Sequence, residues 1–263
     1  MRPLTVPQRA NEVWTVDFKG WFRTGNGQRC EPLTVRDLFS RYVLLVRLLP
    51  SQHGPAVKAA FTALFQQRGL PEIIRVDNGS PFAGRGPAGL SCLSAWWVRL
   101  GIKVEFTRPG CPQDNGAHEQ FHRMLKEQTL RPPTWTRQGQ QHRLTGWLQR
   151  YNRGRPHERL GQTPPARWYC VSPRKFKGTL PKQKYAPGVA VRQVRSNGQI
   201  KWAGRKRFIG EAFVGQQVGL RRRQRGIWTV HFQALLLGHL HHSDPGAMRI
   251  AVRKPKLLSA KKK

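Results

Sequence analysis

The sequence is poor in acidic residues, with 13 Asp and Glu against 47 Lys and Arg in 263 residues. The resulting net charge of +34 lies far outside the usual range of soluble enzymes. A positive field of this size favours a polyanionic partner. Nucleic acid and an anionic membrane surface are therefore the two partner classes to separate.

Long apolar runs are also missing. No stretch approaches the roughly 20 apolar residues that span a bilayer, and positions 1–7 lack the apolar core of a signal peptide. We therefore expect no membrane partner, and intracellular nucleic acid becomes the favoured one. With 38% hydrophobic residues, the chain can still bury a sizeable core.

Cysteine pairs and several catalytic motifs are absent as well. The four cysteines, Cys30, Cys92, Cys111 and Cys170, include no CxxC pair, which argues against a zinc ribbon or a disulfide framework. The patterns GxSxG, HExxH and GxxxxGK before Ser or Thr do not occur, and no His is followed three residues later by Arg. Serine-hydrolase, zincin and P-loop sites are thus disfavoured, as is a tyrosine-recombinase site.

Four histidines gather towards the C-terminus, at His231, His239, His241 and His242. A metal site is one interpretation of this cluster. Because no Cys or carboxylate completes a ligand set there, a solvated loop is the favoured one.

The first part of the chain predicts a mixed α/β module. Positions 12–18, 31–35 and 42–48 have the pattern of strands, and Gly25-Asn26-Gly27 predicts the turn between the first two. A helix over 56–68, a strand ending at Asp77, a helix over 90–100 and a strand over 103–106 follow. Helices are then expected from near Asn115 and over 140–152. This order is compatible with a ribonuclease-H-like mixed sheet with flanking helices, and we assign this core to residues 1–170.

The rest of the chain differs in charge and pattern. Positions 1–170 hold 11 carboxylates and 25 Lys or Arg, whereas positions 171–263 hold only Glu211 and Asp244 against 22 Lys or Arg. A basic, Pro- and Lys-rich linker is expected over 171–188. Short β-branched and aromatic segments over 189–240 predict a small β-barrel of about five strands. The basic tail, 241–263, is suited to nonspecific contacts with phosphates.

Three of the few carboxylates stand where a catalytic metal site could be built. Asp17 lies within the apolar run 13–18, Asp77 closes the run 73–77, and Glu119 lies just inside a predicted helix. Two strand-end aspartates and a helical glutamate are how phosphoryl-transfer nucleases hold two Mg²⁺ or Mn²⁺ ions about 4 Å apart. Such hard cations prefer carboxylate oxygens.

Each of these carboxylates also has a plainer interpretation. Asp77 before Asn78-Gly79 could be a turn residue, and Glu119 could pair with Arg123 one helical turn away. Asp17 is harder to explain in this way, because a carboxylate in an apolar strand is costly unless a cation meets it.

The helix that carries Glu119 has two predicted faces. Phe121, Met124 and Leu125 form an apolar stripe, while Glu119, Arg123 and Lys126 share another face at spacings of four and seven residues. The second face is either a surface that grips a phosphate backbone or an ordinary solvated face.

The sequence resembles the integrase catalytic core of bacterial insertion-sequence transposases, within the retroviral-integrase superfamily. About 160 residues carry the resemblance, through five ordered motifs. These are Asn11-Glu-Val-Trp-Thr-Val-Asp17-Phe-Lys-Gly20, Leu33-Thr-Val-Arg-Asp37 through Ser40-Arg-Tyr42, Asp77-Asn-Gly-Ser-Pro-Phe82, Arg108-Pro-Gly-Cys-Pro-Gln113 with Asn115-Gly116 and Glu119-Gln-Phe-His-Arg123, and Tyr151-Asn152 through Pro164-Pro-Ala166.

The resemblance implies a DDE transposase whose metal-binding triad is Asp17, Asp77 and Glu119. Two Mg²⁺ or Mn²⁺ ions would serve strand cleavage and transfer of the freed 3′-hydroxyl to target DNA. Asn78, Gln113, Arg123 and Lys126 are the candidate DNA contacts. The resemblance further implies a bacterial, cytoplasmic, DNA-associated protein that acts as a homo-oligomer, with no small-molecule substrate, and a C-terminal module that binds DNA.

Two alternatives remain, a truncated DNA-binding remnant without catalysis and a ribonuclease-H-type nuclease. Family members commonly carry helix-turn-helix modules before the core, whereas this chain begins almost at its first strand. We therefore expect a preceding region or a partner to recognise the element ends. Gln120 also stands where family members often have Arg, and Arg123 is expected to compensate.

Overall fold

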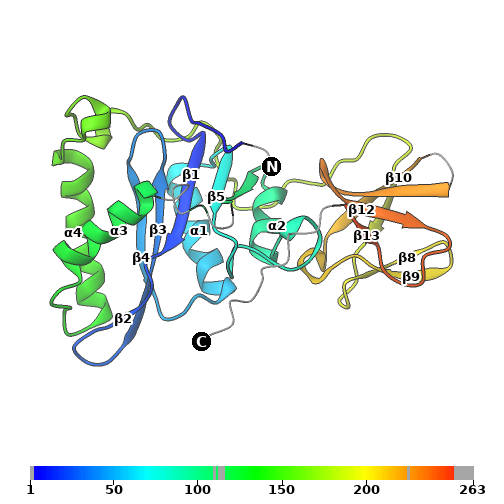
Figure 1. Ribbon diagram of the computed structural model, residues 1–263, viewed down its shortest axis with the longest axis horizontal. Coiled ribbons are helices and arrows are strands. Elements are labelled where there is room, and N and C mark those ends of the chain that lie inside the picture. Colours follow the sequence, from blue (N-terminus) through cyan, green and yellow to red (C-terminus); the bar gives the residue numbers. More distant parts are fainter. Residues whose placement is uncertain (1–2, 109–110, 112–115, 224–225, 252–263) are drawn as a thin grey trace. The chain divides into compact units, whose positions relative to one another are not determined.

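The computed structural model describes residues 3–108, 111, 116–223 and 226–251, and the chain divides into two compact units (Figure 1). The first unit comprises Met1–Pro81 and Leu100–Leu180, and the second comprises Phe82–Arg99 and Pro181–Lys263. None of the helices in the described part of the chain is long and apolar enough to cross a membrane.

The first unit is built on a six-stranded mixed sheet. Its strands are β1 (Val13–Phe18), β2 (Phe22–Arg23), β3 (Arg29–Asp37), β4 (Val43–Leu49), β5 (Ile73–Val76) and β6 (Lys103–Phe106). They follow the order β2-β3-β1-β5-β6, and β4 also pairs with β3. The pairs among β1 to β4 are antiparallel, whereas β1–β5 and β5–β6 are parallel. The predicted mixed sheet is confirmed.

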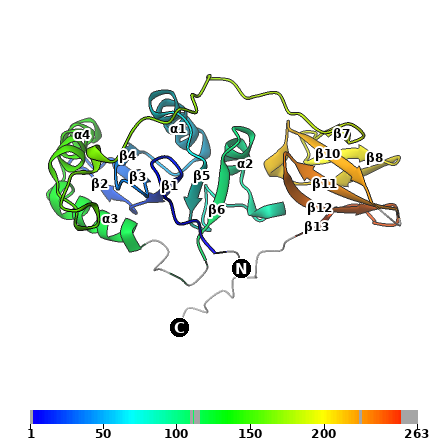
Figure 2. The ribbon, with the colours of Figure 1, turned by 90° about the horizontal axis from the view of Figure 1, so that it is seen from above.

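Alternation along these strands gives the sheet two unlike faces, because successive side chains point to opposite sides. Trp14 and Val16 lie on the face that packs on α1 (Gly54–Arg68), where the rings of Trp14 and Phe65 are 6.1 Å apart. Pro55 suits the first turn of α1, where its missing N–H is not needed. The other face turns towards α3 (Gly116–Thr129), and Figure 2 shows α1 and α3 on opposite sides of the sheet.

Helices α3 and α4 (Arg137–Gly154) cover the second face with an apolar cluster. Phe121 and Leu125 from α3 and Leu144 and Trp147 from α4 pack there with β4 residues such as Val46. Helix α4 is capped at its start by the Thr136 hydroxyl, which accepts from the Gly139 N–H at 3.1 Å. The predicted apolar stripe of α3 is therefore buried, with Met124 partly so.

The strand and helix order of the first unit follows the sequence expectation, with one local correction. The short strand β2 was not predicted, and the turn at Gly25-Asn26-Gly27 joins β2 to β3 instead of joining β1 to β3. A strand of two residues is too short to show an alternating pattern, which explains the miss.

The described residues of the second unit form seven strands and the helix α2 (Cys92–Arg99), which contacts the 3₁₀ helix η5 (Glu211–Phe213). The strands are β7 (Ala190–Gln193), β8 (Gln199–Trp202), β9 (Arg205–Phe208), β10 (Gln217–Arg222), β11 (Ile227–Phe232), β12 (Leu235–His241) and β13 (Arg249–Ile250). Five form an antiparallel sheet in the order β13-β12-β11-β10-β7, and β8 and β9 form a separate hairpin. Pairing among the described strands does not close a barrel, so the barrel stays a prediction.

The interpretation of the C-terminal histidines as a loop is wrong for three of the four. His231 lies in β11, and His239 and His241 lie in β12, where each is partly buried. The pattern hid β12 because Gly238 and two histidines interrupt its apolar residues, and these residue types are not enriched in strands. Pairing with β11 on one side and β13 on the other supplies the burial that the pattern lacks.

Candidate active site

Asp17 and Asp77 lie at the carboxyl ends of two neighbouring parallel strands. The register of β1 and β5 pairs Val13 with Ile73 and Thr15 with Arg75. Extending it by two residues places Asp17 opposite Asp77, which directly follows β5. Neighbouring strands lie about 4.8 Å apart, and residues in one row point to the same face. We infer from this extension that the two carboxylates share the face of the sheet that turns towards α3.

Local hydrogen bonds orient both carboxylates. Oδ1 of Asp17 accepts from the Phe18 N–H at 2.8 Å, and Oδ1 of Asp77 accepts from the Gly79 N–H at 3.0 Å. A Cβ at Gly79 would lie 3.0 Å from Oδ2 of Asp77, so glycine leaves room for this carboxylate. Asp77 is thus the turn residue that its sequence allows.

Thr34 connects the strand of Asp17 to α3. It pairs with Asp17 across β1 and β3, and its hydroxyl donates to the Asp17 carbonyl at 3.0 Å. The same oxygen lies 2.7 Å from Nε2 of His118 and 2.8 Å from Nε2 of His122. A hydroxyl has one hydrogen and two lone pairs, so both imidazoles donate to Thr34 when all three bonds form. This cluster was not predicted from the sequence, although His118 and His122 are one helical turn apart and flank Glu119.

His122 also approaches the Asp17 carboxylate, with its Nδ1 3.8 Å from Oδ2. Burial, together with the nearby charges of Lys19 and Arg36, lowers the pKa of His122 to about 3. His122 is therefore neutral at neutral pH, and its contact with Asp17 is not an ion pair. Burial likewise holds the pKa of His118 well below its usual value.

Glu119 lies in the first turn of α3, one turn before His122, with its side chain exposed. Arg123 and Lys126 are exposed as well. Among the residues that the structure describes, no three or more His, Cys, Asp or Glu side chains are gathered as a metal site. The extended strand register thus predicts Asp17 and Asp77 as neighbours, Glu119 lies on α3, and the triad stays a prediction.

The four candidate DNA contacts lie in different places. Nδ2 of Asn78 donates to the Thr107 carbonyl at 2.7 Å, which ties the end of β5 to the end of β6. Gln113 lies outside the described residues. Arg123 and Lys126 follow Glu119 on the exposed surface of α3, where they are free of the apolar core.

Comparison with known proteins identifies both units. Two models described as "Integrase core domain" match residues 7–112 and 100–165, and the model "IS481 family transposase, C-terminal domain" matches residues 189–241. The chain belongs to the integrase-core transposase family.

Two curated relatives come from insertion elements. The IS407 uncharacterized 31.7 kDa protein of Burkholderia multivorans is 28% identical over 164 residues, which make up 62% of this chain and 57% of that protein. The IS476 uncharacterized 39.2 kDa protein of Xanthomonas euvesicatoria is 29% identical over 166 residues, which make up 63% of this chain and 46% of that protein. This integrase-core chain therefore spans about half the length of the curated relatives it matches.

A solved structure supports the fold. The integrase-core chain is similar to a chain in the cryo-electron microscopy structure of the simian T-cell lymphotropic virus intasome bound to PP2A regulatory subunit B56 gamma. The TM-score is 0.53 at 17% identity, over 89% of this chain and 80% of that one. At this identity the likeness establishes the integrase-type, ribonuclease-H-like fold.

Proposed function

We propose that this protein is a DDE-type transposase that cleaves DNA strands at the ends of a mobile element and joins their 3′-hydroxyl ends to target DNA. The observation that carries the proposal is the parallel register of β1 and β5, which sets Asp17 opposite Asp77 when it is extended by two residues. Membership of the integrase-core transposase family supports the same chemistry.

The residues at this position suit Mg²⁺ or Mn²⁺. Asp17 and Asp77 offer hard oxygen ligands on one face of the sheet, and Asp17 keeps 21% of its side chain exposed. Glu119 is the proposed third ligand, from the first turn of α3. Two bound ions would activate the attacking oxygen and stabilise the leaving oxygen of a phosphodiester.

The surrounding residues have two proposed roles. Thr34 holds the backbone of Asp17 in place, because its hydroxyl donates to the Asp17 carbonyl and also lies within hydrogen-bonding distance of His122 on α3. Arg123 and Lys126, exposed on α3 after Glu119, would contact the phosphate backbone beside the carboxylates. Gln113 and Asn78 remain proposed contacts of the bound DNA.

DNA is the proposed partner of both units. The second unit carries many exposed Lys and Arg side chains. They are Arg192, Arg195, Lys201, Arg205, Lys206, Arg221, Arg222 and Arg223. Exposed cations of this kind bind the phosphates of DNA with little regard to base sequence. Joining two element ends at one target also favours a homo-oligomer as the active species.

A strand-joining assay with the full chain tests this function. The substrate is DNA from either side of the gene, with supercoiled plasmid as target and Mg²⁺ or Mn²⁺ as the added metal. We expect Asp17→Asn, Asp77→Asn and Glu119→Gln to reduce joining to the level seen without metal, while binding to duplex DNA is unchanged. The matched control is Glu72→Gln, which removes a carboxylate that pairs with Arg9 on the surface.

The products separate the competing functions. Cleavage without joining would identify a ribonuclease-H-type nuclease, and binding without cleavage would identify a non-catalytic remnant. Full joining activity in Asp17→Asn would refute the assignment of the site.

A further inference from the structure

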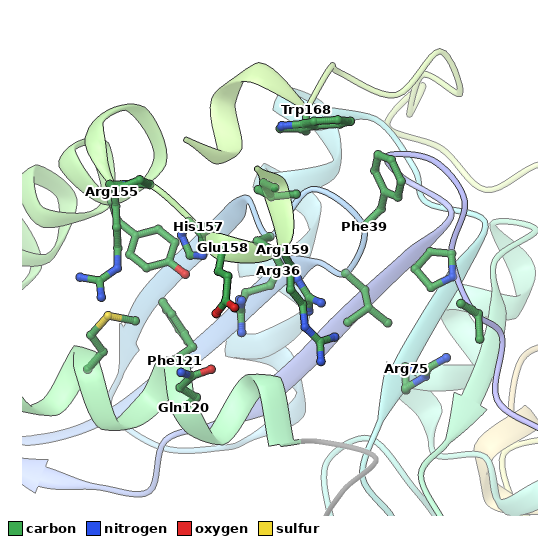
Figure 3. A pocket seen from close by; sticks show the side chains of 18 of the residues that line it. Arg36, Phe39, Arg75, Gln120, Phe121, Arg155, His157, Glu158, Arg159 and Trp168 are labelled. Atoms are coloured by element: carbon green, nitrogen blue, oxygen red, sulfur yellow. The ribbon is translucent and has the colours of Figure 1, made fainter. Parts of the chain in front are cut away.

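A cavity of about 1070 Å³ lies within the first unit, close to the candidate active site. It is bounded by β3, α3, the end of α4, the segment after α4 and residues 4–7 (Figure 3). We call it the arginine cavity, because Arg36, Arg41, Arg75, Arg155 and Arg159 line it. Its volume is of the order that proteins use to enclose small ligands, about 300–1,000 Å³.

The sheet register places this cavity beside the two aspartates. Arg36, Thr15 and Arg75 form one row across β3, β1 and β5. Thr34 and Asp17 form the row two residues further along, on the same face, and extending the register of β1 and β5 adds Asp77 to it. Two residues of a strand span about 7 Å. A DNA strand rises about 3.4 Å per nucleotide in a duplex, so a strand lying at the aspartates would reach the cavity within about two nucleotides.

The charge in the cavity is unbalanced. Glu158 is the one carboxylate among its lining residues, and Arg75 is neutralised by Glu105 at 3.1 Å. Arg36 is only 5% exposed, so burial strengthens its effect on a nearby charge.

The titration of the lining groups shows the same repulsion. Burial and the charge of Arg159 lower the pKa of Arg41. Burial, together with Arg36, Arg155 and Arg41, lowers the pKa of His157 to about 4. An anion in the cavity would relieve this repulsion, because an opposite charge stabilises the protonated forms.

Aromatic rings at the cavity supply a second kind of contact. The rings of Phe39 and Trp168 are 6.2 Å apart at an angle of 70°, and Trp168 is 45% exposed. Figure 3 shows these two rings and the labelled arginines around one hollow. Bases of an unpaired strand stack on exposed aromatic side chains, whereas bases within a duplex are already stacked. Cationic and aromatic groups lining one cavity are therefore suited to single-stranded nucleic acid.

We propose that the arginine cavity binds an unpaired DNA strand, with a phosphate held by Arg36, Arg41 and Arg159 and a base stacked on Phe39 or Trp168. The strand would be the one that leaves the aspartates after the duplex opens. The path of the strand from the aspartates to the cavity rests on the proposed function, whereas the binding of an unpaired strand in the cavity does not.

Photo-crosslinking of the full chain tests the proposal without metal or catalysis. The probe is an oligothymidylate that carries 5-iododeoxyuridine, in buffer with EDTA, and mass spectrometry maps the crosslinked peptides. We expect crosslinks at Phe39 or Trp168. Excess unlabelled oligothymidylate should abolish them, and an equal amount of duplex should not.

Two pairs of variants sharpen the experiment. Arg159→Ala and Trp168→Ala should each lower these crosslinks about tenfold, which corresponds to the loss of one stacked base or one charged contact. The matched controls are Arg153→Ala, exposed on α4 outside the cavity, and Trp135→Ala, with a tryptophan that is 71% exposed. Both controls should change the yield of crosslinks by less than about twofold, which is clearly smaller than the expected loss of about tenfold.

The electrostatic and stacking contributions separate in the salt dependence of binding. Losing one phosphate contact on a single strand should reduce the slope of log K against log salt by about 0.7 for Arg159→Ala. Trp168→Ala should leave the slope unchanged.

Three results would overturn the proposal. They are crosslinks confined to other segments, equal competition by duplex, and equal competition by polyglutamate, which would identify a site for acidic peptides. Asp17→Asn should retain the crosslinks. A failure of the catalytic assignment would therefore leave the crosslinking test intact. A failure of the crosslinking test would likewise leave the catalytic assignment intact.

Discussion

Thr34 is a buried hydroxyl that ties Asp17 to α3 through a single oxygen atom. It is fully buried and lies within hydrogen-bonding distance of His118, His122 and the Asp17 carbonyl. Leaving a buried donor or acceptor without a partner costs about 1–3 kcal/mol. The position of Asp17 therefore depends on a residue that makes no direct contact with a metal or with DNA.

We expect Thr34→Val to destabilise the first unit by about 1–3 kcal/mol, because it removes the shared partner of two imidazoles and keeps the side-chain volume. Urea unfolding followed by circular dichroism would measure the change. The control is Thr145→Val, whose hydroxyl donates to the Gln141 carbonyl on the exposed surface of α4. A change in Thr34→Val no larger than that in Thr145→Val would contradict the role of this hydroxyl.

Single residues differ in how far the sequence could predict them. Asp17 and Asp77 could be proposed as site residues because a carboxylate at the end of an apolar run is conspicuous in a chain with few acids. Thr34 could not, because threonine is common in strands and its partners lie 84 and 88 residues away. The arginine cavity was missed for a related reason, since its lining comes from segments far apart along the chain.

At the scale of elements, the turn of the β8–β9 hairpin depends on the backbone conformation of its two loop residues. Its two-residue loop is Ala203-Gly204, with φ values of 49° and 73°. Positive φ at both positions is the type I′ turn that matches the twist of paired strands. Ala203 bears a cost in this conformation, whereas Gly204 does not.

We expect Gly204→Ala to weaken this hairpin by about 1–2 kcal/mol, the cost of a left-handed non-glycine residue. A Cβ at Gly204 would meet no atom within 4 Å, so the cost is conformational and not steric. Amide hydrogen exchange of β8 and β9 would measure it. Gly246→Ala is the matched control, since its Cβ also meets nothing within 4 Å and its φ is not positive. Equal exchange in both variants would exclude this explanation.

Whole elements were predictable where their pattern was long and regular. The strands of the first sheet and helices α1, α3 and α4 follow from alternation and helical spacing. Strands β12 and β13 were not predicted, because β12 contains Gly238 and two histidines and β13 has only two residues. These strands depend on pairing with β11 and with each other, which a local pattern does not contain.

At the scale of the whole molecule, several of the few carboxylates have structural partners. Glu105 pairs with Arg75 and Lys103, Asp244 pairs with Arg249, and Asp37 accepts from Ser40 and Asn11. Asp77, by contrast, makes no ion pair with any residue that the structure describes, although 47 Lys and Arg surround so few acids. A carboxylate without such a partner in a chain this basic is well suited to bind a metal cation.

The most direct test of the central claim is an anomalous-difference map from crystals of the full chain soaked in Mn²⁺. Mn²⁺ takes the same oxygen ligands as Mg²⁺ and can be located by its own scattering. We expect a peak between the carboxylates of Asp17 and Asp77, and we expect Asp17→Asn crystals to lack it. Well-occupied Mn²⁺ peaks elsewhere, with none at Asp17 and Asp77, would contradict the proposed active site.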